Sequence, residues 1–241
     1  MRDVFYQFLT GALDLVLWGG ELAGEENLPQ RGPAVFVANH LDAQGPIAAV
    51  CSIPIRLYPW IAGEMLDRER AAAYLDMDFV ERQLHLKPPL GLGLARTLSR
   101  ITVPLLRSLG CVPVHKGDYE GMQETLELSM DVLRQGHFLL GFPEDNLLPS
   151  DPLTKMRPFQ RSFARLGESY YEETGQRLAF YPVAIHAAGT VRVGRPVAFN
   201  PFNRPGFERH RLKDLLENTV RAMYLELDGQ DLQGALTPQH K

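Results

Sequence analysis

The 241-residue sequence contains few cysteines, and none has the spacing of a metal site. Only Cys51 and Cys111 are present, with no C-x-x-C motif and no paired cysteine and histidine motif. This absence argues against structural zinc. A chain of this length buries roughly 70% or more of its unfolded surface on folding, so it needs no disulfide. The cysteine content therefore fits the reducing cytosol.

The chain also lacks an excess of positive charge and a long apolar run. Its formal net charge is −4, which argues against general binding of nucleic acid. No run of about 18 apolar residues could span a membrane. The N-terminus has neither a basic region nor a small-residue cleavage site, and Asp14 interrupts its apolar stretch, so no signal peptide is expected. Hydrophobic residues make up 45% of the chain, which excludes a disordered protein.

Short apolar runs alternate with polar turns and helical patterns along the chain, which predicts an α/β fold. We expect a central, mostly parallel twisted sheet flanked by helices, preceded by an N-terminal amphipathic helical segment. Strands are expected at 34–38, 111–114, 137–143, 178–185 and 191–199. Helices are expected at 3–18, 46–51, 123–134, 158–174 and 208–227, and within 62–87. No linker divides the chain, so we expect a single domain over 1–241, with an N-terminal segment (1–26), a core (27–200) and a C-terminal helix and tail (201–241).

Two segments have more than one interpretation. Residues 3–18 place apolar side chains on one helical face, which suits either packing on the domain or a helix lying in a membrane interface. Residues 87–110 are apolar and contain arginines but no acid. They form either an element that faces a membrane or lines an acyl chain, or a buried helical hairpin broken at Pro104.

Polar side chains follow the expected strands, where each strand ends. Because the carboxyl ends of parallel strands meet at one edge of a sheet, we expect these side chains to converge there. An imidazole at this edge is a candidate general base, because histidine can accept a proton near neutral pH. A histidine at the end of a single strand is more often a hydrogen-bonded surface residue, so the joint pattern carries the argument. These residues are Asn39, His40, His115, Lys116, Glu144, Asp145 and His186.

Four blocks of the sequence occur in an order typical of one protein family. They are VANHLDAQGP, SLGCVPVHKG, LLGFPED and FYPVAI, within residues 27–200. They resemble the N-H-x-x-x-x-D, G-x-x-x-V-x-R, F-P-E-G-T-R and V-P-V-type blocks of the 1-acylglycerol-3-phosphate acyltransferase superfamily. The stretches RPFQRSFARLG and VRVGRPV resemble later parts of the same family.

The resemblance implies transfer of an acyl group from acyl-CoA or acyl-carrier protein to a lipid hydroxyl, typically of a lysophospholipid. It implies that His40 deprotonates the acceptor, that Lys116 replaces an arginine that contacts the acceptor phosphate, and that Glu144 matches the third-block glutamate. No metal, cofactor or acyl-enzyme is required. The expected location is the cytoplasm, peripheral on the inner face of the membrane, in phospholipid biosynthesis. The oligomeric state is left open.

The sequence departs from the family at two positions. The fifth residue after His40 is Gly45, where the family has an aspartate that orients the imidazole. Asp42 either takes over that role or caps a turn or the next helix, and Glu144 and Asp145 are further candidates. The arginine of the third block is replaced within Asp145-Asn146-Leu147, and Lys155, Arg157 and Arg161 are available as replacement charge or as a solvated basic face.

Two functions are compatible with these departures. The first is an active acyltransferase with a changed acceptor, and the second is a catalytically impaired relative that binds lipid or acyl chains without turnover. For the first, the catalytic candidates are His40, Asp42 and Glu144. The substrate-binding candidates are Asn39, His115, Lys116, Asp145, Arg157 and Arg161.

Overall fold

A computed structural model describes residues 20–41, 44–81, 85, 87, 89–115 and 119–236. The contacts between Cα atoms divide the chain into two compact units. The first comprises Met1–Leu57 and Val132–Lys241, and the second comprises Tyr58–Asp131. The single domain expected from the sequence stays a prediction.

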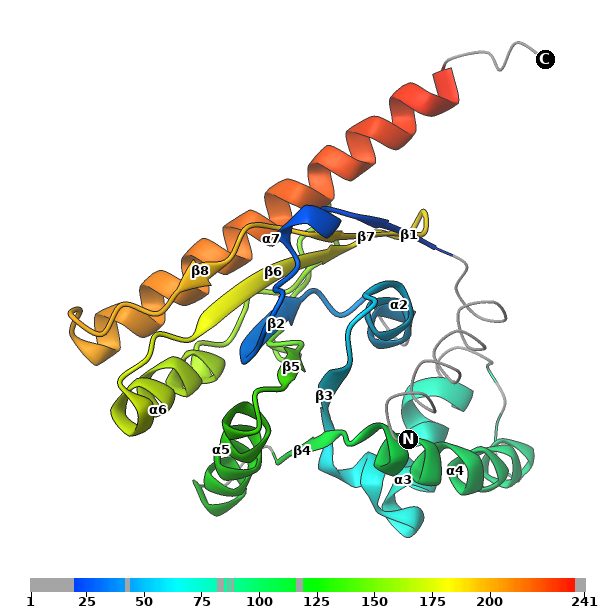
Figure 1. The fold of residues 1–241 in the computed structure, drawn as a ribbon. Helices are drawn as coiled ribbons and strands as arrows, with labels where there is room; N and C mark the ends of the chain where they lie inside the picture. The colour runs from blue at the N-terminus through cyan, green and yellow to red at the C-terminus, as the bar shows by residue number, and fades with distance from the viewer. Residues whose placement is uncertain are drawn as a thin grey trace. The chain divides into compact units, whose positions relative to one another are not determined.

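The first unit contains a mostly parallel sheet with the strand order β1-β7-β6-β2-β5 (Figure 1). All adjacent pairs in this order are parallel except β6 and β7, and β8 lies antiparallel to β6. The strands are β1 (Glu21–Ala23), β2 (Ala34–Ala38), β5 (Phe138–Gly141), β6 (Ala179–Ile185), β7 (Thr190–Val193) and β8 (Val197–Ala198). This sheet confirms the predicted α/β architecture with a mostly parallel sheet flanked by helices.

β2 lies in the interior of this sheet. Its five residues, AVFVA, are all buried, because β5 and β6 pair with its two edges and side chains cover both of its faces. A continuous apolar run, without polar alternation, is what such a strand requires. The rings of Phe36 and Tyr181 stack on one face at a centroid distance of 5.1 Å.

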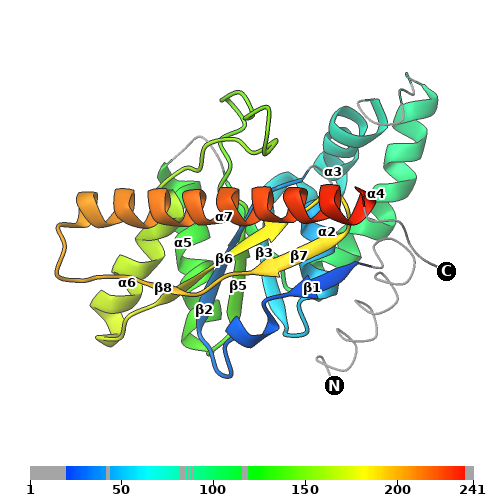
Figure 2. The same ribbon diagram turned by 90° about the horizontal axis from the view of Figure 1, so that it is seen from above.

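Helices lie on both faces of the sheet of the first unit. α7 (Pro205–Leu236) crosses the strands on one face, and α2 (Gln44–Ser52) lies on the other (Figures 1 and 2). α6 (Arg165–Thr174) precedes β6 and ends at Gly175, whose φ of 69° is the left-handed conformation that glycine adopts readily. Leu212, Leu216 and Val220 of α7 are fully buried and form its sheet-facing stripe.

The second unit contains two paired strands and several helices. β3 (Leu57–Ala62) pairs in parallel with β4 (Val112–Val114). The helices are η3 (Gly63–Leu66), α3 (Arg68–Leu75), η4 (Asp76–Glu81), α4 (Leu90–Leu109) and α5 (Tyr119–Arg134), in which the division between the units falls. Trp60 on β3 donates its indole N–H to the Ser129 hydroxyl on α5 at 3.0 Å.

The helical hairpin considered for residues 87–110 is wrong, because α4 is one continuous helix through Pro104. Pro104 is exposed, so water can satisfy the carbonyl that loses its partner there. Four buried residues of α4 are four positions apart, Gly91, Ala95, Ser99 and Val103, and Leu109 near its end is also buried. Whether its exposed face meets a membrane stays a prediction, and the predicted helix 3–18 lies outside the described residues.

Other boundaries also differ from the prediction. The helix expected from Pro158 begins later, at the short η5 (Ser162–Ala164) that leads into α6, because Phe159 forms a β-bridge instead. The strand expected over 191–199 is divided into β7 and β8. The final helix, expected over 208–227, extends through all of α7.

Candidate functional site

The parallel register of β2 and β5 brings His40 and Glu144 to the same level at the carboxyl edge of the sheet. Val37 lies opposite Gly141 in this register. His40 and Glu144 each follow three residues later, after both strands have ended. Two residues that are 104 positions apart in sequence therefore meet where ligands bind in open α/β sheets.

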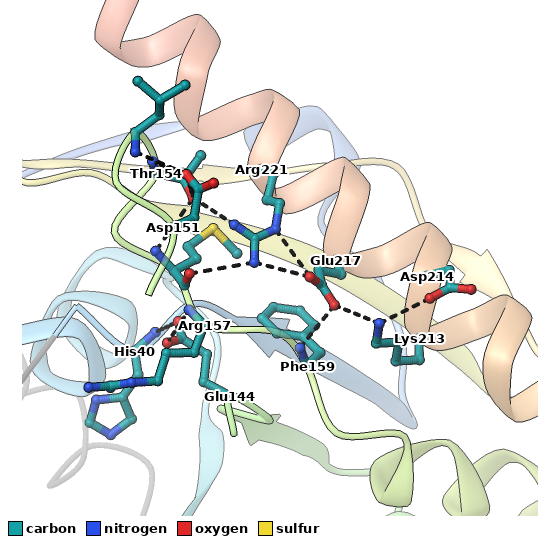
Figure 3. A network of polar contacts seen from close by, with 12 residues as sticks. His40, Glu144, Asp151, Thr154, Arg157, Phe159, Lys213, Asp214, Glu217 and Arg221 are labelled. Carbon is teal, nitrogen blue, oxygen red and sulfur yellow. Dashed lines mark hydrogen bonds and ion pairs between the residues drawn. The ribbon is translucent and has the colours of Figure 1, made fainter. Parts of the chain in front are cut away.

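Glu144 fixes the main chain of His40. The His40 N–H donates to Oε1 of Glu144 at 2.8 Å, and the Arg157 N–H donates to Oε2 at 3.0 Å (Figure 3). Glu144 is only 7% exposed, so these hydrogen bonds supply the partners that a buried carboxylate needs. Glu144 thus joins the end of β2 to the loop that follows β5, and it acts here as a positioning residue.

The imidazole of His40 is exposed, and it meets the edge of the Phe142 ring at a centroid distance of 5.2 Å. Within the described part of the chain, no carboxylate forms a hydrogen bond or an ion pair with this ring. The prediction that Glu144 or Asp145 orients the ring is wrong, because neither carboxylate forms a hydrogen bond or an ion pair with it. Glu144 binds main-chain N–H groups, and Oδ1 of Asp145 accepts the Leu147 N–H at 3.1 Å.

Asn39, which precedes His40, holds β2 against β6. Its side-chain amide donates to the Ile185 carbonyl at 3.0 Å, and its oxygen accepts the Ile185 N–H at 2.7 Å. The residue is 2% exposed. Both ends of the amide are therefore bound to the main chain, so Asn39 continues the strand pairing and fixes the point from which His40 emerges. Its predicted contact with substrate remains a prediction.

Gly45, five residues after His40, lies against the main chain of His40. A Cβ atom built there would be 3.0 Å from the His40 carbonyl carbon and 3.2 Å from its oxygen. The Gly45 N–H donates to the Leu41 carbonyl at 3.0 Å, which closes the turn that starts α2. The absence of a side chain at position 45 thus permits a close approach between α2 and the end of β2.

A closed loop connects Glu144 with Phe159, and we call residues 145–158 the β5–α6 loop. An antiparallel bridge between Glu144 and Phe159 closes its base. The Asp145 N–H donates to the Pro158 carbonyl at 2.9 Å, and the Gln160 N–H donates to the Pro143 carbonyl at 2.7 Å. Loops of this length without regular structure are usually functional.

Charged residues of α7 hold this loop from the other side. Oε2 of Glu217 accepts the Phe159 N–H at 2.9 Å, and Arg221 donates to the Thr154 hydroxyl at 2.8 Å (Figure 3). Burial raises the pKa of Glu217, but the Phe159 N–H, Lys213 and Arg221 outweigh it, so this pKa lies below its ordinary value. Glu217 is therefore an anion in the fold, and α7 supports the loop through charge-assisted hydrogen bonds.

Arg157, a predicted substrate-binding residue, is joined to His40 through the Glu144 carboxylate. Its N–H shares the Glu144 carboxylate with the His40 N–H, and both side chains extend to the same side of Glu144 (Figure 3). Arg157 is half-buried. Among the described residues no carboxylate pairs with its guanidinium, which leaves the charge available to an anionic ligand.

Other predicted site residues lie elsewhere. Arg161 is exposed and donates to Nε2 of His210 at 2.6 Å on α7. His115 belongs to the second unit, where its ring packs on Gly63 and its Nε2 is 3.7 Å from Oε2 of Glu124. The predicted residues Asp42 and Lys116 lie outside the described residues.

Sequence reasoning missed the contribution of α7. Lys213, Glu217 and Arg221 are spaced four residues apart, which predicts helical ion pairs but not their contacts with a distant loop. His186 follows β6 as expected, yet it is 5% exposed, and its Nε2 lies 3.5 Å from Asp228 of α7. Its ring packs against Tyr224 of α7 at a centroid distance of 4.7 Å.

The described residues contain no helix long and apolar enough to cross a membrane. They also contain no cluster of three His, Cys, Asp or Glu side chains placed to hold a metal ion.

Comparison with protein-family models and with curated protein sequences finds no match for this chain. Its structure is similar to the crystal structure of the 1-acyl-sn-glycerophosphate (LPA) acyltransferase PlsC from Thermotoga maritima, with a TM-score of 0.56. The two chains are 14% identical, and the alignment covers 95% of this chain and 83% of that chain. At this identity the similarity shows a shared fold.

Proposed function

We propose that this protein is an acyltransferase that moves a fatty acyl group from acyl-CoA or acyl-carrier protein to a hydroxyl of a lysophospholipid or related lipid. One observation carries the proposal: an exposed imidazole, His40, stands at the carboxyl edge of a parallel sheet, and a buried carboxylate holds its main chain. The fold shared with a lysophosphatidate acyltransferase and the four sequence blocks support it.

His40 acts as general base in the proposed reaction. It takes the proton of the acceptor hydroxyl while the oxygen attacks the carbonyl carbon of the thioester. The carbon–sulfur bond then breaks, the ester is released, and the proton passes from the imidazolium to the leaving thiolate. Main-chain N–H groups near the start of α2 are candidates to stabilise the oxyanion, although the Gly45 N–H is already bound to Leu41.

Arg157 is the proposed binding group for the phosphate of the acceptor. The third block lacks its arginine, and Arg157 supplies a guanidinium on the other chain segment held by Glu144. A guanidinium binds phosphate through paired, charge-assisted hydrogen bonds. The acceptor is therefore expected to carry a phosphate or another anionic group.

Replacing Arg157 with glutamine is expected to raise the KM for a lysophosphatidate acceptor about tenfold and to change kcat less than threefold, because binding charge is lost while His40 remains. Steady-state kinetics with varied acceptor measure this. The matched control is Arg165→Gln at the start of α6, which should leave KM unchanged. A fall in kcat at unchanged KM would contradict the assignment of Arg157 to binding.

The lipid acceptor places the proposed reaction at a membrane surface, and the thioester donors place it on the cytosolic side. Residues 3–18 and the exposed face of α4 are the membrane contacts predicted from sequence. On α4, Leu90 and Ile101 are exposed, as are Arg96 and Arg100. This combination of apolar and basic side chains suits a lipid interface.

The wild-type protein provides the direct test. Purified protein is incubated with a panel of acyl-CoA and acyl-carrier-protein thioesters and lysolipids, and free thiol is measured. We expect thiol release that requires both a donor and a lysolipid acceptor, with a matching ester product. Binding of lipid or acyl chains without thiol release across the panel would replace the proposal with the catalytically impaired alternative.

A further inference from the structure

The β5–α6 loop, whose base is joined to His40 through Glu144, carries a set of exposed apolar side chains. Leu147 is 92% exposed, Leu153 is 71% exposed, and Leu148 is also exposed. The loop projects past α7, away from the strands of its unit (Figure 2). Single exposed leucines are common on protein surfaces, but three on one projecting loop require a reason.

Several main-chain N–H groups of this loop are bound within the loop, which lowers the cost of bringing it into an apolar layer. The N–H groups of Leu153 and Thr154 donate to Oδ1 of Asp151, and the Lys155 N–H donates to the Asp151 carbonyl. In the other arm, the N–H groups of Leu147 and Leu148 both donate to Asp145.

Other features of the loop further reduce the number of main-chain N–H groups that lack a hydrogen-bond partner. Pro149 and Pro152 have no N–H. The Asp151 N–H donates to the Met156 carbonyl at 2.8 Å, so the two arms of the loop are tied together near the apex. The hydrogen bonds from Thr154 and Leu153 lower the pKa of Asp151, whose carboxylate thus serves the loop itself.

Charges of both signs lie beside the leucines. The carboxylates of Asp145 and Asp151 are bound to main-chain N–H groups of the loop itself. The arm that returns to α6 carries Lys155 and Arg157, and Arg161 follows just beyond the loop. In the described part of the chain no carboxylate pairs with any of the three. The cations of the returning arm, which no carboxylate of the described residues pairs with, lie beside exposed leucines, and this combination suits anionic lipid headgroups.

We infer that the β5–α6 loop inserts its leucines into the surface of a lipid bilayer that contains anionic headgroups, and that it thereby presents His40 to membrane-embedded acceptors. This inference rests on the proposed function for the identity of the acceptor. Hydrogen bonds fix the loop relative to His40, because Glu144 joins the base of the loop to the His40 main chain and Arg221 binds Thr154. The loop is thus a docking element built into the site.

Vesicle flotation tests the insertion without catalysis. The full chain and its Leu147→Asp/Leu153→Asp variant are mixed with vesicles of phosphatidylcholine and phosphatidylglycerol. We expect the double variant to bind about tenfold more weakly or worse, because each leucine loses favourable burial and gains a charge. The matched control is Phe207→Asp, a similarly exposed apolar residue about 20 Å from Arg221 along α7, which should change binding less than twofold. Equal binding by the double variant and the wild type overturns the inference.

A second measurement does not depend on a disruptive substitution. Leu147→Trp is expected to show a shift of its fluorescence to shorter wavelength when anionic vesicles are added, beyond the shift of the unsubstituted chain. Phe207→Trp should show none. No shift at position 147 on addition of vesicles overturns the inference. A shift that appears with rising concentration of the chain itself but not with vesicles overturns it in favour of a second copy of the chain as the partner.

The failure of this inference can be distinguished from failure of the proposed function. Thiol release is measured with a short-chain lysolipid that is dissolved as monomers. The double variant should retain the wild-type rate there and lose activity only against acceptors in vesicles. If the wild type releases no thiol in either format, the proposed function fails while the flotation result still stands.

Discussion

Replacing His40 with alanine is expected to lower the rate of thiol release about a thousandfold, within the 10²- to 10⁴-fold range of general base catalysis. Alanine cannot accept the proton of the acceptor, so the hydroxyl would have to attack the thioester unassisted. Because the imidazole is exposed, its removal should change the free energy of unfolding by less than about 0.5 kcal/mol. The measurement is kcat with saturating donor and acceptor, together with thermal unfolding.

The control for this variant is His137→Ala. His137 precedes β5, at the opposite edge of the sheet from His40, so its removal should leave turnover within twofold. Turnover by His40→Ala at the wild-type rate would exclude His40 as the base and with it the proposed mechanism. An equal loss in both histidine variants would indicate a general disturbance of the fold.

Replacing Glu144 with alanine is expected to destabilise the fold by about 2–4 kcal/mol and to lower turnover at least about tenfold. Two charge-assisted hydrogen bonds would be lost, and the N–H groups of His40 and Arg157 would lose their acceptor. The end of β2 and the β5–α6 loop would no longer be joined, so His40 would leave its position. Denaturant unfolding and steady-state kinetics measure the two effects.

Glu144→Gln and Asp145→Ala serve as controls for this prediction. The glutamine side chain keeps one acceptor oxygen, so its cost should be intermediate. Asp145 is the neighbouring acid, and its carboxylate serves the Leu147 N–H in an exposed part of the loop, so its removal should cost less than about 1 kcal/mol. A Glu144→Ala variant that loses stability yet keeps its kcat would show that the junction supports the fold without placing His40.

The sequence was sufficient to predict features that depend on local composition. The uninterrupted apolar run of β2 and the glycine after α6 indicate a buried strand and a helix end, and both are found. β3 was missed because LYPWIA contains a proline and no regular alternation. The path of α4 through Pro104 was not predictable, since the exposure of that proline depends on tertiary packing.

The sequence was sufficient to predict which residues form the site, but not which groups they contact. Because His40 and Glu144 each follow an expected parallel strand, both were predicted at the same edge of the sheet. The register of two strands, which no local pattern reveals, decides that Glu144 meets the main chain of His40 rather than its ring. The support from Glu217 and Arg221 depends on how α7 crosses the unit, so spacing along the helix could not reveal it.

The tight fit of Gly45 against His40 restricts where an orienting acid can come from. A side chain at position 45 would press on the backbone that carries the imidazole, so an aspartate introduced there would displace the ring that it is meant to align. Reconstituting a catalytic dyad in this chain therefore calls for a carboxylate from outside the first turn of α2, approaching the ring from its solvent side.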